Sequence, residues 1–85
     1  MFGHSPITPT QRRILQFFQE QPHAVETPKG IAIWLCAELD EVTHALQGLV
    51  DRKWLSAHEA SAVVGYSLTG NDRFLAEIKQ TLEAS

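Results

Sequence analysis

Apolar residues recur at steps of three and four along most of this chain, which is the spacing of helices that bury one face. The first such segment covers residues 9–20, and its apolar positions are Ile14, Leu15, Phe17 and Phe18. Thr8 and Pro9 stand at its start, the preferred residue types for an N-cap followed by the first helical position. Gln11 completes the pattern of a capping box. We therefore predict a helix over 9–20.

The central stretch, 27–55, predicts two further helices joined by a tight turn. Thr27 and Pro28 repeat the cap-and-proline start, so the helices are expected over 28–36 and 39–52, with the turn near 36–38. Their predicted buried positions are Ala32, Leu35, Val42, Ala45, Leu46 and Leu49. Within each half the steps of three and four mark one buried face. This is the layout of a helix-turn-helix, whose second helix leaves its other face free.

The remainder of the chain predicts a hairpin and a last helix. Strands are expected at 54–57 and 63–68, joined by a loop of about five residues at 58–62, and a shorter strand is expected around Val25. Thr69 is expected to cap the last helix, whose apolar face is Phe74, Leu75, Ile78 and Leu82. The predicted fold class is α+β, mostly helical. We expect one domain over 8–85, preceded by a flexible arm over 1–7.

In this order, the elements resemble those of a winged-helix domain, and the chain is similar over about 8–82 to MarR-type bacterial regulators. Besides the helix spacing, the run 51–55 (DRKWL) leading into the hairpin and the run 66–69 (YSLT) leading out of it carry the resemblance. The resemblance implies a three-helix core with a two- to three-stranded β-wing and a C-terminal helix. It also implies a dimeric transcriptional regulator that contacts the DNA major groove with helix 39–52 and the backbone with the 56–64 wing.

Three positions depart from the pattern of that family. Lys53 stands where glycine is usual after the recognition helix, so a side chain must adopt a strained turn conformation. Glu38 replaces the small polar cap expected before the same helix. The wing tip, 58–62, has no Lys or Arg where the family often has one. The first two departures bear on stability, and the third weakens the case for DNA binding.

Composition limits the protein class. The 85 residues are enough for one small domain, and seven Lys and Arg against ten Asp and Glu give a formal charge of −3. Cys36 is the sole cysteine, which excludes an internal disulfide and favours a reducing cytoplasm. No apolar run approaches the roughly 18 residues that cross a bilayer, and no signal peptide is recognisable. We expect a complete cytoplasmic chain with no membrane partner.

The candidate DNA-reading face is the exposed side of helix 39–52. Gln47 could pair with adenine and Arg52 could reach a phosphate or a guanine. However, segment 38–53 has four acidic and two basic residues, a formal −2, so a solvated surface is the alternative interpretation. The candidate contacts to double-stranded DNA are Lys29, Thr43, His44, Gln47, Arg52, Lys53 and His58.

A second candidate surface lies on helix 28–36, where Ile33 and Trp34 occupy positions that are usually polar in this family. Trp is enriched at interface hot spots, so these residues could bind another protein or a second copy of the chain. The alternative is that the helix is rotated, or that the N-terminal arm covers them. The candidate interface residues are Ile33, Trp34, Phe17, Leu75 and Leu82.

Catalytic and metal chemistry has no support in the sequence. The four histidines are scattered, no pair shows the spacing of a zinc site, and no phosphate loop or nucleophile-and-base pattern occurs. We therefore predict no enzyme activity, no cofactor and no metal. Two functions remain: a DNA-binding regulator, which we favour, and a winged-helix protein–protein interaction module with weak or no DNA binding.

Overall fold

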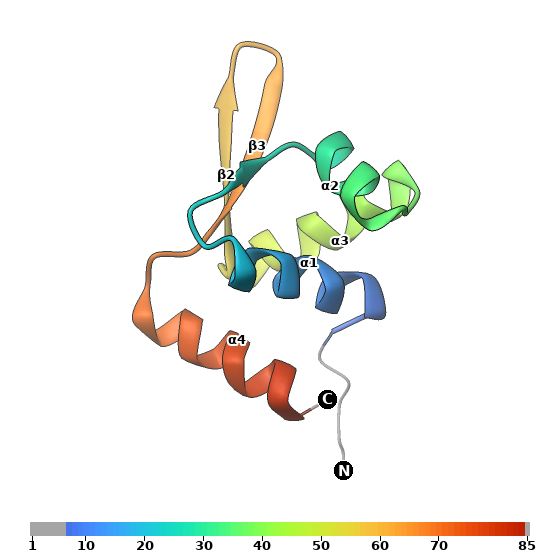
Figure 1. Cartoon of the computed structure of the whole chain (residues 1–85). Helices are drawn as coiled ribbons and strands as arrows, with labels where there is room; N and C mark the ends of the chain where they lie inside the picture. Colours follow the sequence, from blue (N-terminus) through green and yellow to red (C-terminus); the bar gives the residue numbers. More distant parts are fainter. Residues whose placement is uncertain (1–6, 85) are drawn as a thin grey trace.

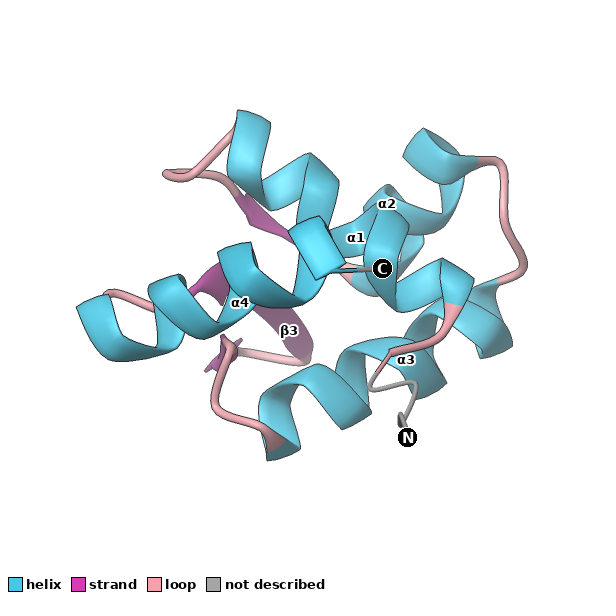
Figure 2. Cartoon of the chain, turned by 90° about the horizontal axis from the view of Figure 1, so that it is seen from below, coloured by secondary structure: helices cyan, strands magenta, loops and turns pink. Residues whose placement is uncertain are grey.

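The computed structural model describes residues 7–84, so the predicted arm lies outside the described residues except for Ile7. Four helices and three strands follow in the order α1 (Pro9–Glu20), β1 (Val25–Glu26), α2 (Pro28–Leu35), α3 (Leu39–Asp51), β2 (Leu55–Ala60), β3 (Val63–Leu68) and α4 (Asp72–Ala84). The β2–β3 hairpin stands out from the helical body, and α4 lies at the opposite end from the hairpin tip (Figure 1). In the view from below, α4 lies in front of the strands (Figure 2). The predicted order of elements is confirmed.

Hydrogen bonds between neighbouring residues fix the N-terminus of α1. Thr8 Oγ1 accepts a hydrogen bond from the Gln11 backbone N–H at 3.1 Å, and Gln11 Oε1 accepts one from the Thr8 N–H at 3.0 Å. This reciprocal pair is the capping box expected from the sequence. Gln11 also donates its Nε2–H to the carbonyl of Ala45 at 3.3 Å, which ties α1 to α3.

The core lies between the first three helices and the base of the hairpin. The predicted inward positions of α2 and α3 are buried, and Trp54 and Leu55 are buried as well. The largest fully buried side chains are Phe18, Ile14, Leu15, Ile31, Leu46, Leu49, Ile78 and Val42. Each side chain of this size contributes about 1.5–3 kcal/mol when removed from water. From α4, Ile78 is buried in this core and Phe74, Leu75 and Leu82 pack against it half-buried, so α4 covers the core from outside.

The sheet has the order β1-β3-β2 with antiparallel pairs. Because Ala60 pairs with Val63, the hairpin closes through Ser61 and Ala62, and the predicted five-residue loop is wrong. Residues 58–60 belong to β2. The distal hairpin has water on both faces, so only Leu55 of β2 is buried and the strand lacks the alternation that would have revealed it.

The start of α4 also corrects the prediction. Asn71 Oδ1 accepts hydrogen bonds from the backbone N–H groups of Arg73 at 2.9 Å and Phe74 at 3.3 Å, so Asn71 caps the helix and Thr69 does not. Thr69 is still held at the sheet, because its backbone N–H donates to the carbonyl of Trp54 at 3.0 Å. Because Thr69 is still bound to the hairpin, the N-cap of α4 lies two residues later in the chain than predicted.

The end of α3 shows the strain expected at Lys53. Its φ is 66°, in the left-handed region. The Lys53 N–H donates to the carbonyl of Val50 at 2.8 Å, and the Trp54 N–H donates to that of Leu49 at 3.1 Å. These two bonds form a Schellman motif, in which glycine is the usual residue at the left-handed position. Cys36 ends α2 in the same way, with a φ of 54°.

Candidate nucleic-acid interface

Helix α3 divides cleanly into a buried and an exposed side. Val42, Leu46 and Leu49 are fully buried, which turns Thr43, His44 and Gln47 toward solvent. The hydroxyl of Thr43 donates to the carbonyl of Leu39 at 2.8 Å, which leaves its oxygen able to accept a further bond. The predicted orientation of α3 is therefore confirmed, and three candidate DNA contacts share one exposed face.

This face opens into two adjoining hollows between α3 and the start of α1. The first is about 550 Å³ and is lined by Thr8, Pro9, Thr10, Gln11, Asp40, Glu41, His44 and Ala45. The second is about 540 Å³ and is lined by Gln11, Asp40, Thr43, His44, Gln47, Gly48 and Asp51. Gln11, Asp40 and His44 belong to both, so the hollows form one surface, which we call the α3 groove.

The electrostatics of the α3 groove differ from those of a typical DNA-reading surface. None of the described residues that line it is Lys or Arg, whereas Asp40 and Asp51 lie along it. Glu41 accepts a hydrogen bond from the hydroxyl of Thr10, which occupies part of its carboxylate. Glu38 precedes α3 without a side-chain capping bond, as expected for this poorer cap. The groove can form hydrogen bonds through His44 and Gln47 but attracts phosphate weakly.

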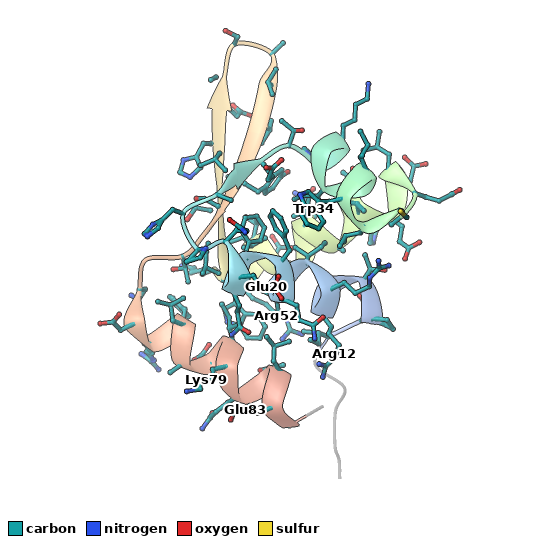
Figure 3. The ribbon with its side chains drawn as sticks, in the orientation of Figure 1. Arg12, Glu20, Trp34, Arg52, Lys79 and Glu83 are labelled. Atoms are coloured by element: carbon teal, nitrogen blue, oxygen red, sulfur yellow. The ribbon has the colours of Figure 1, made fainter. Side chains whose placement is uncertain are left out.

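The candidate cations lie outside this groove. The guanidinium carbon of Arg52 is 5.0 Å from the centre of the Trp54 ring, a cation–π distance. The Trp54 indole in turn donates to Glu77 of α4 at 3.1 Å. Arg52 accordingly lies below α1, toward α4, in Figure 3. Lys29, in the first turn of α2, and Lys53 are both exposed and remain available to a phosphate.

The strands of the hairpin, expected to be the DNA-contacting wing, are nearly free of positive charge. His58 Nε2 and Ser67 Oγ are 2.7 Å apart across the two strands, on an exposed face. The sequence of β2 and β3 includes no Lys or Arg, so His58 is the basic side chain available there. At the tip, Ser61 has a φ of 58°, which a tight two-residue turn requires.

The candidate protein-interface residues separate into two groups. Ile33 is 71% exposed and Trp34 62% exposed, so the interpretation that α2 is rotated to bury them is wrong. Phe17 is buried in the core, but its ring lies 5.3 Å from that of Trp34 at an interplanar angle of 57°. Leu75 and Leu82 are half-buried and pack against the core from α4. Ile33 and Trp34 therefore form the accessible part of this set.

The arginines of α1 have structural partners that the sequence did not reveal. Arg13 donates through Nη2 to the carbonyl of Leu35 at 2.6 Å, at the end of α2, and Arg12 donates to the carbonyl of Leu82 at 3.3 Å. A cation at a helix C-terminus also interacts favourably with the helix dipole. Because both bonds span more than 20 residues of sequence, no local pattern could have predicted them.

Within residues 7–84, no group of three or more His, Cys, Asp or Glu side chains could hold a metal ion. None of the described helices is long and apolar enough to cross a membrane.

No protein-family profile matches the chain, and no curated protein matches it by sequence. Solved structures do match. A possible transcriptional regulator from Methanosarcina mazei Go1 aligns at a TM-score of 0.79 and 12% identity, covering 94% of this chain and 71% of its own. A variant of ZitR from Lactococcus lactis aligns at 0.70 and 28% identity over 94% and 53%. The adhesin competence repressor AdcR from Streptococcus pyogenes aligns at 0.64 and 22% identity over 92% and 62%.

The fold prediction is confirmed by these alignments together with the observed elements. The chain has the α+β, mostly helical fold of a winged-helix domain and is similar to MarR-type regulators. It spans about half to three quarters of the length of these three structures.

Proposed function

We propose that this chain is a DNA-binding transcriptional regulator in which α3 enters the major groove and the 56–64 wing contacts the DNA backbone. The observation that carries the proposal is the outer face of α3, because Thr43, His44 and Gln47 project from one side of a helix whose other side is buried in the core. The similarity to a possible transcriptional regulator and to a repressor supports the same function. Fold similarity alone does not establish it.

The proposed contacts have distinct roles. Gln47 suits a bidentate pair with adenine, and Thr43 and His44 can each accept or donate one hydrogen bond to a base edge. Lys29 and Lys53 would neutralise phosphates and thereby set the affinity without reading sequence. Arg52 and His58 complete the candidate set. The guanidinium of Arg52 also makes a cation–π contact with the Trp54 ring.

The expected affinity is low because the cations are few. If Lys29, Arg52 and Lys53 each neutralise one phosphate, the slope of log K against log salt concentration is about −3. Asp40 and Asp51 along the α3 groove oppose that attraction. We therefore expect weak duplex binding that is detectable at low salt and declines toward physiological salt.

A second candidate function is a protein–protein interaction module with weak or no DNA binding. The acidic α3 groove and a wing without Lys or Arg favour it, since both weaken any hold on phosphates. The exposed Ile33 and Trp34 would then provide the apolar contact that protein interfaces concentrate in a few residues.

Fluorescence anisotropy with a labelled mixed-sequence duplex at several salt concentrations separates the two candidates. Under the regulator proposal, Lys53→Ala reduces the salt slope by about 1, and Gln47→Ala weakens binding to a selected site more than to mixed sequence. Lys79→Ala is the matched control, because it removes the same charge from α4. A lack of binding at low salt would exclude the regulator proposal and leave the interaction module.

A further inference from the structure

The α3 groove has a carboxylate at each end. Asp40 lies in the first turn of α3 and Asp51 is its last residue. They are eleven residues apart, close to three full turns, so they lie on nearly the same stripe of the helix, about 16 Å from each other along its axis. Both are exposed and both line the groove. The groove therefore presents two negative charges at a separation that the helix fixes.

Neither carboxylate is neutralised by a neighbouring group. No residue within 7–84 forms a hydrogen bond or an ion pair with the side chain of Asp40 or Asp51. Arg52 follows Asp51 in the chain, but its guanidinium contacts the Trp54 ring and does not line the groove. Asp51 also stands in the last turn of α3, where the helix dipole disfavours a negative charge. A bound cation would relieve this unfavourable charge.

Between the two ends, hydrogen-bond acceptors alternate with small uncharged surface. Thr43 donates its hydroxyl to a backbone carbonyl of the preceding turn, so its oxygen is left as an acceptor, and the Gln47 amide oxygen is another. Gly48 has no side chain and Ala45 has a single methyl group, so the floor between the acceptors is open. Gln11 forms the facing wall and is tied to the Ala45 carbonyl.

We propose that the α3 groove binds a linear polyamine in its extended form, with one terminal ammonium at Asp40 and the other at Asp51. Extended spermine places its terminal ammonium groups about 16 Å apart, which matches the separation of the two aspartates. Its inner ammonium groups donate to Thr43 and Gln47, and its methylene groups lie over Gly48. The hollow along this stripe, about 540 Å³, is of the size that holds a small ligand.

The two charged ends make length the property that selects the ligand. An anion is repelled from both ends. A single cation or a short diamine reaches one aspartate and gains one exposed ion pair, which stabilises a complex little. A chain that spans the groove forms the second pair within the same complex, at a high effective concentration.

The bound polyamine lies over His44 and Gln47, the residues that the proposed regulator uses to read bases. It therefore occupies the face assigned to DNA. The inference does not rest on DNA binding, because it follows from the charges and shape of the groove alone. The experiments below contain no DNA, so their failure would leave the proposed function standing, and failure of DNA binding would leave this inference standing.

Titration of the full chain with spermine at constant ionic strength, followed by two-dimensional ¹H–¹⁵N NMR, tests the proposal. We expect saturable shifts of the backbone amides within 40–51. Asp40→Asn and Asp51→Asn should each raise the dissociation constant about two- to fivefold, because each removes one exposed ion pair. Glu59→Gln makes the same charge change on the exposed hairpin and should have no effect. Shifts spread equally over all acidic residues, or a dissociation constant indifferent to both aspartates, would overturn the proposal.

A series of diamines tests the bridging geometry directly. Diamines with four, eight or twelve methylene groups carry the same charge, but the longest spans about 16 Å and reaches both aspartates. It should bind the unmodified chain most tightly, and this advantage should largely disappear in Asp51→Asn. An advantage of length that persists in Asp51→Asn would come from apolar contact and would refute the bridge.

A basic peptide tests the choice of ligand. Acetylated and amidated tetralysine carries as many ammonium groups as spermine, but they branch from a peptide backbone that is bulkier than a methylene chain. It should bind less tightly than spermine. Binding as tight as that of spermine, or tighter, would assign the groove to a basic protein segment and overturn the polyamine.

Discussion

Replacing Lys53 by glycine should stabilise this protein, although it removes an entire side chain. Lys53 has a φ of 66°, where the Cβ of an ordinary residue crowds its own backbone. The turn at this position is required, because the Lys53 and Trp54 N–H groups satisfy the last carbonyls of α3 there. Glycine adopts the same φ without that crowding and keeps both hydrogen bonds.

The size of the effect follows from two opposing contributions. The left-handed conformation costs a residue with a side chain about 1–2 kcal/mol. Glycine loses more freedom on folding, which costs about 0.5–1 kcal/mol relative to alanine. Lys53→Gly should therefore raise the free energy of unfolding by about 0.5–1 kcal/mol, and the melting temperature by roughly 2–8 °C for a domain of this size.

Urea unfolding of three variants tests this reasoning. Lys53→Ala removes the charge but keeps the Cβ, so it should change stability by less than about 0.5 kcal/mol. Lys79→Gly, inside α4, should destabilise by about 1 kcal/mol, since glycine is unfavourable at ordinary helical positions. The reasoning is refuted if Lys53→Gly is no more stable than Lys53→Ala.

Three further stability predictions follow from the same structure, all measured by urea unfolding. Leu46→Ala should cost about 2–5 kcal/mol, because Leu46 is fully buried; a loss below about 1 kcal/mol would contradict its central position. Asn71→Ala and Thr8→Ala should each cost about 1 kcal/mol by removing an N-cap, and an unaffected Asn71→Ala would mean that the cap lies elsewhere. Gly48→Ala should be nearly neutral alone, because its methyl would come within 2.6 Å of Gln11 Nε2 and displace the amide from the Ala45 carbonyl. In a Gln11→Ala background it should instead stabilise by about 1 kcal/mol, and equal effects in both backgrounds would exclude this coupling.

The hairpin and the start of α4 show where prediction from sequence failed. The end of strand β2 was predicted three residues too early because its distal part is exposed on both faces and leaves no alternating pattern. Thr69 has the right residue type for an N-cap, but its N–H still donates to the carbonyl of Trp54, the residue before β2. In both cases a contact with a distant segment decided a local boundary.

The candidate site shows the same division. The outward face of α3 was predictable, since Val42, Leu46 and Leu49 identify the inward face by their spacing. The α3 groove was not, because a third of its lining comes from the start of α1, more than 25 residues away in sequence. The ring of Phe17, which is buried, is what orients the exposed Trp34.

The sequence by itself determined the type and order of the helices and strands, the buried face of each helix and the strained position at Lys53. These depend on periodicity, capping and the φ preferences of single residues, all of which act within a few positions along the chain. The tertiary structure decided which surfaces exist: the α3 groove, the partners of Arg12, Arg13 and Arg52, and the exposure of Trp34. Such features arise when segments far apart in sequence pack together, and no local pattern records that arrangement.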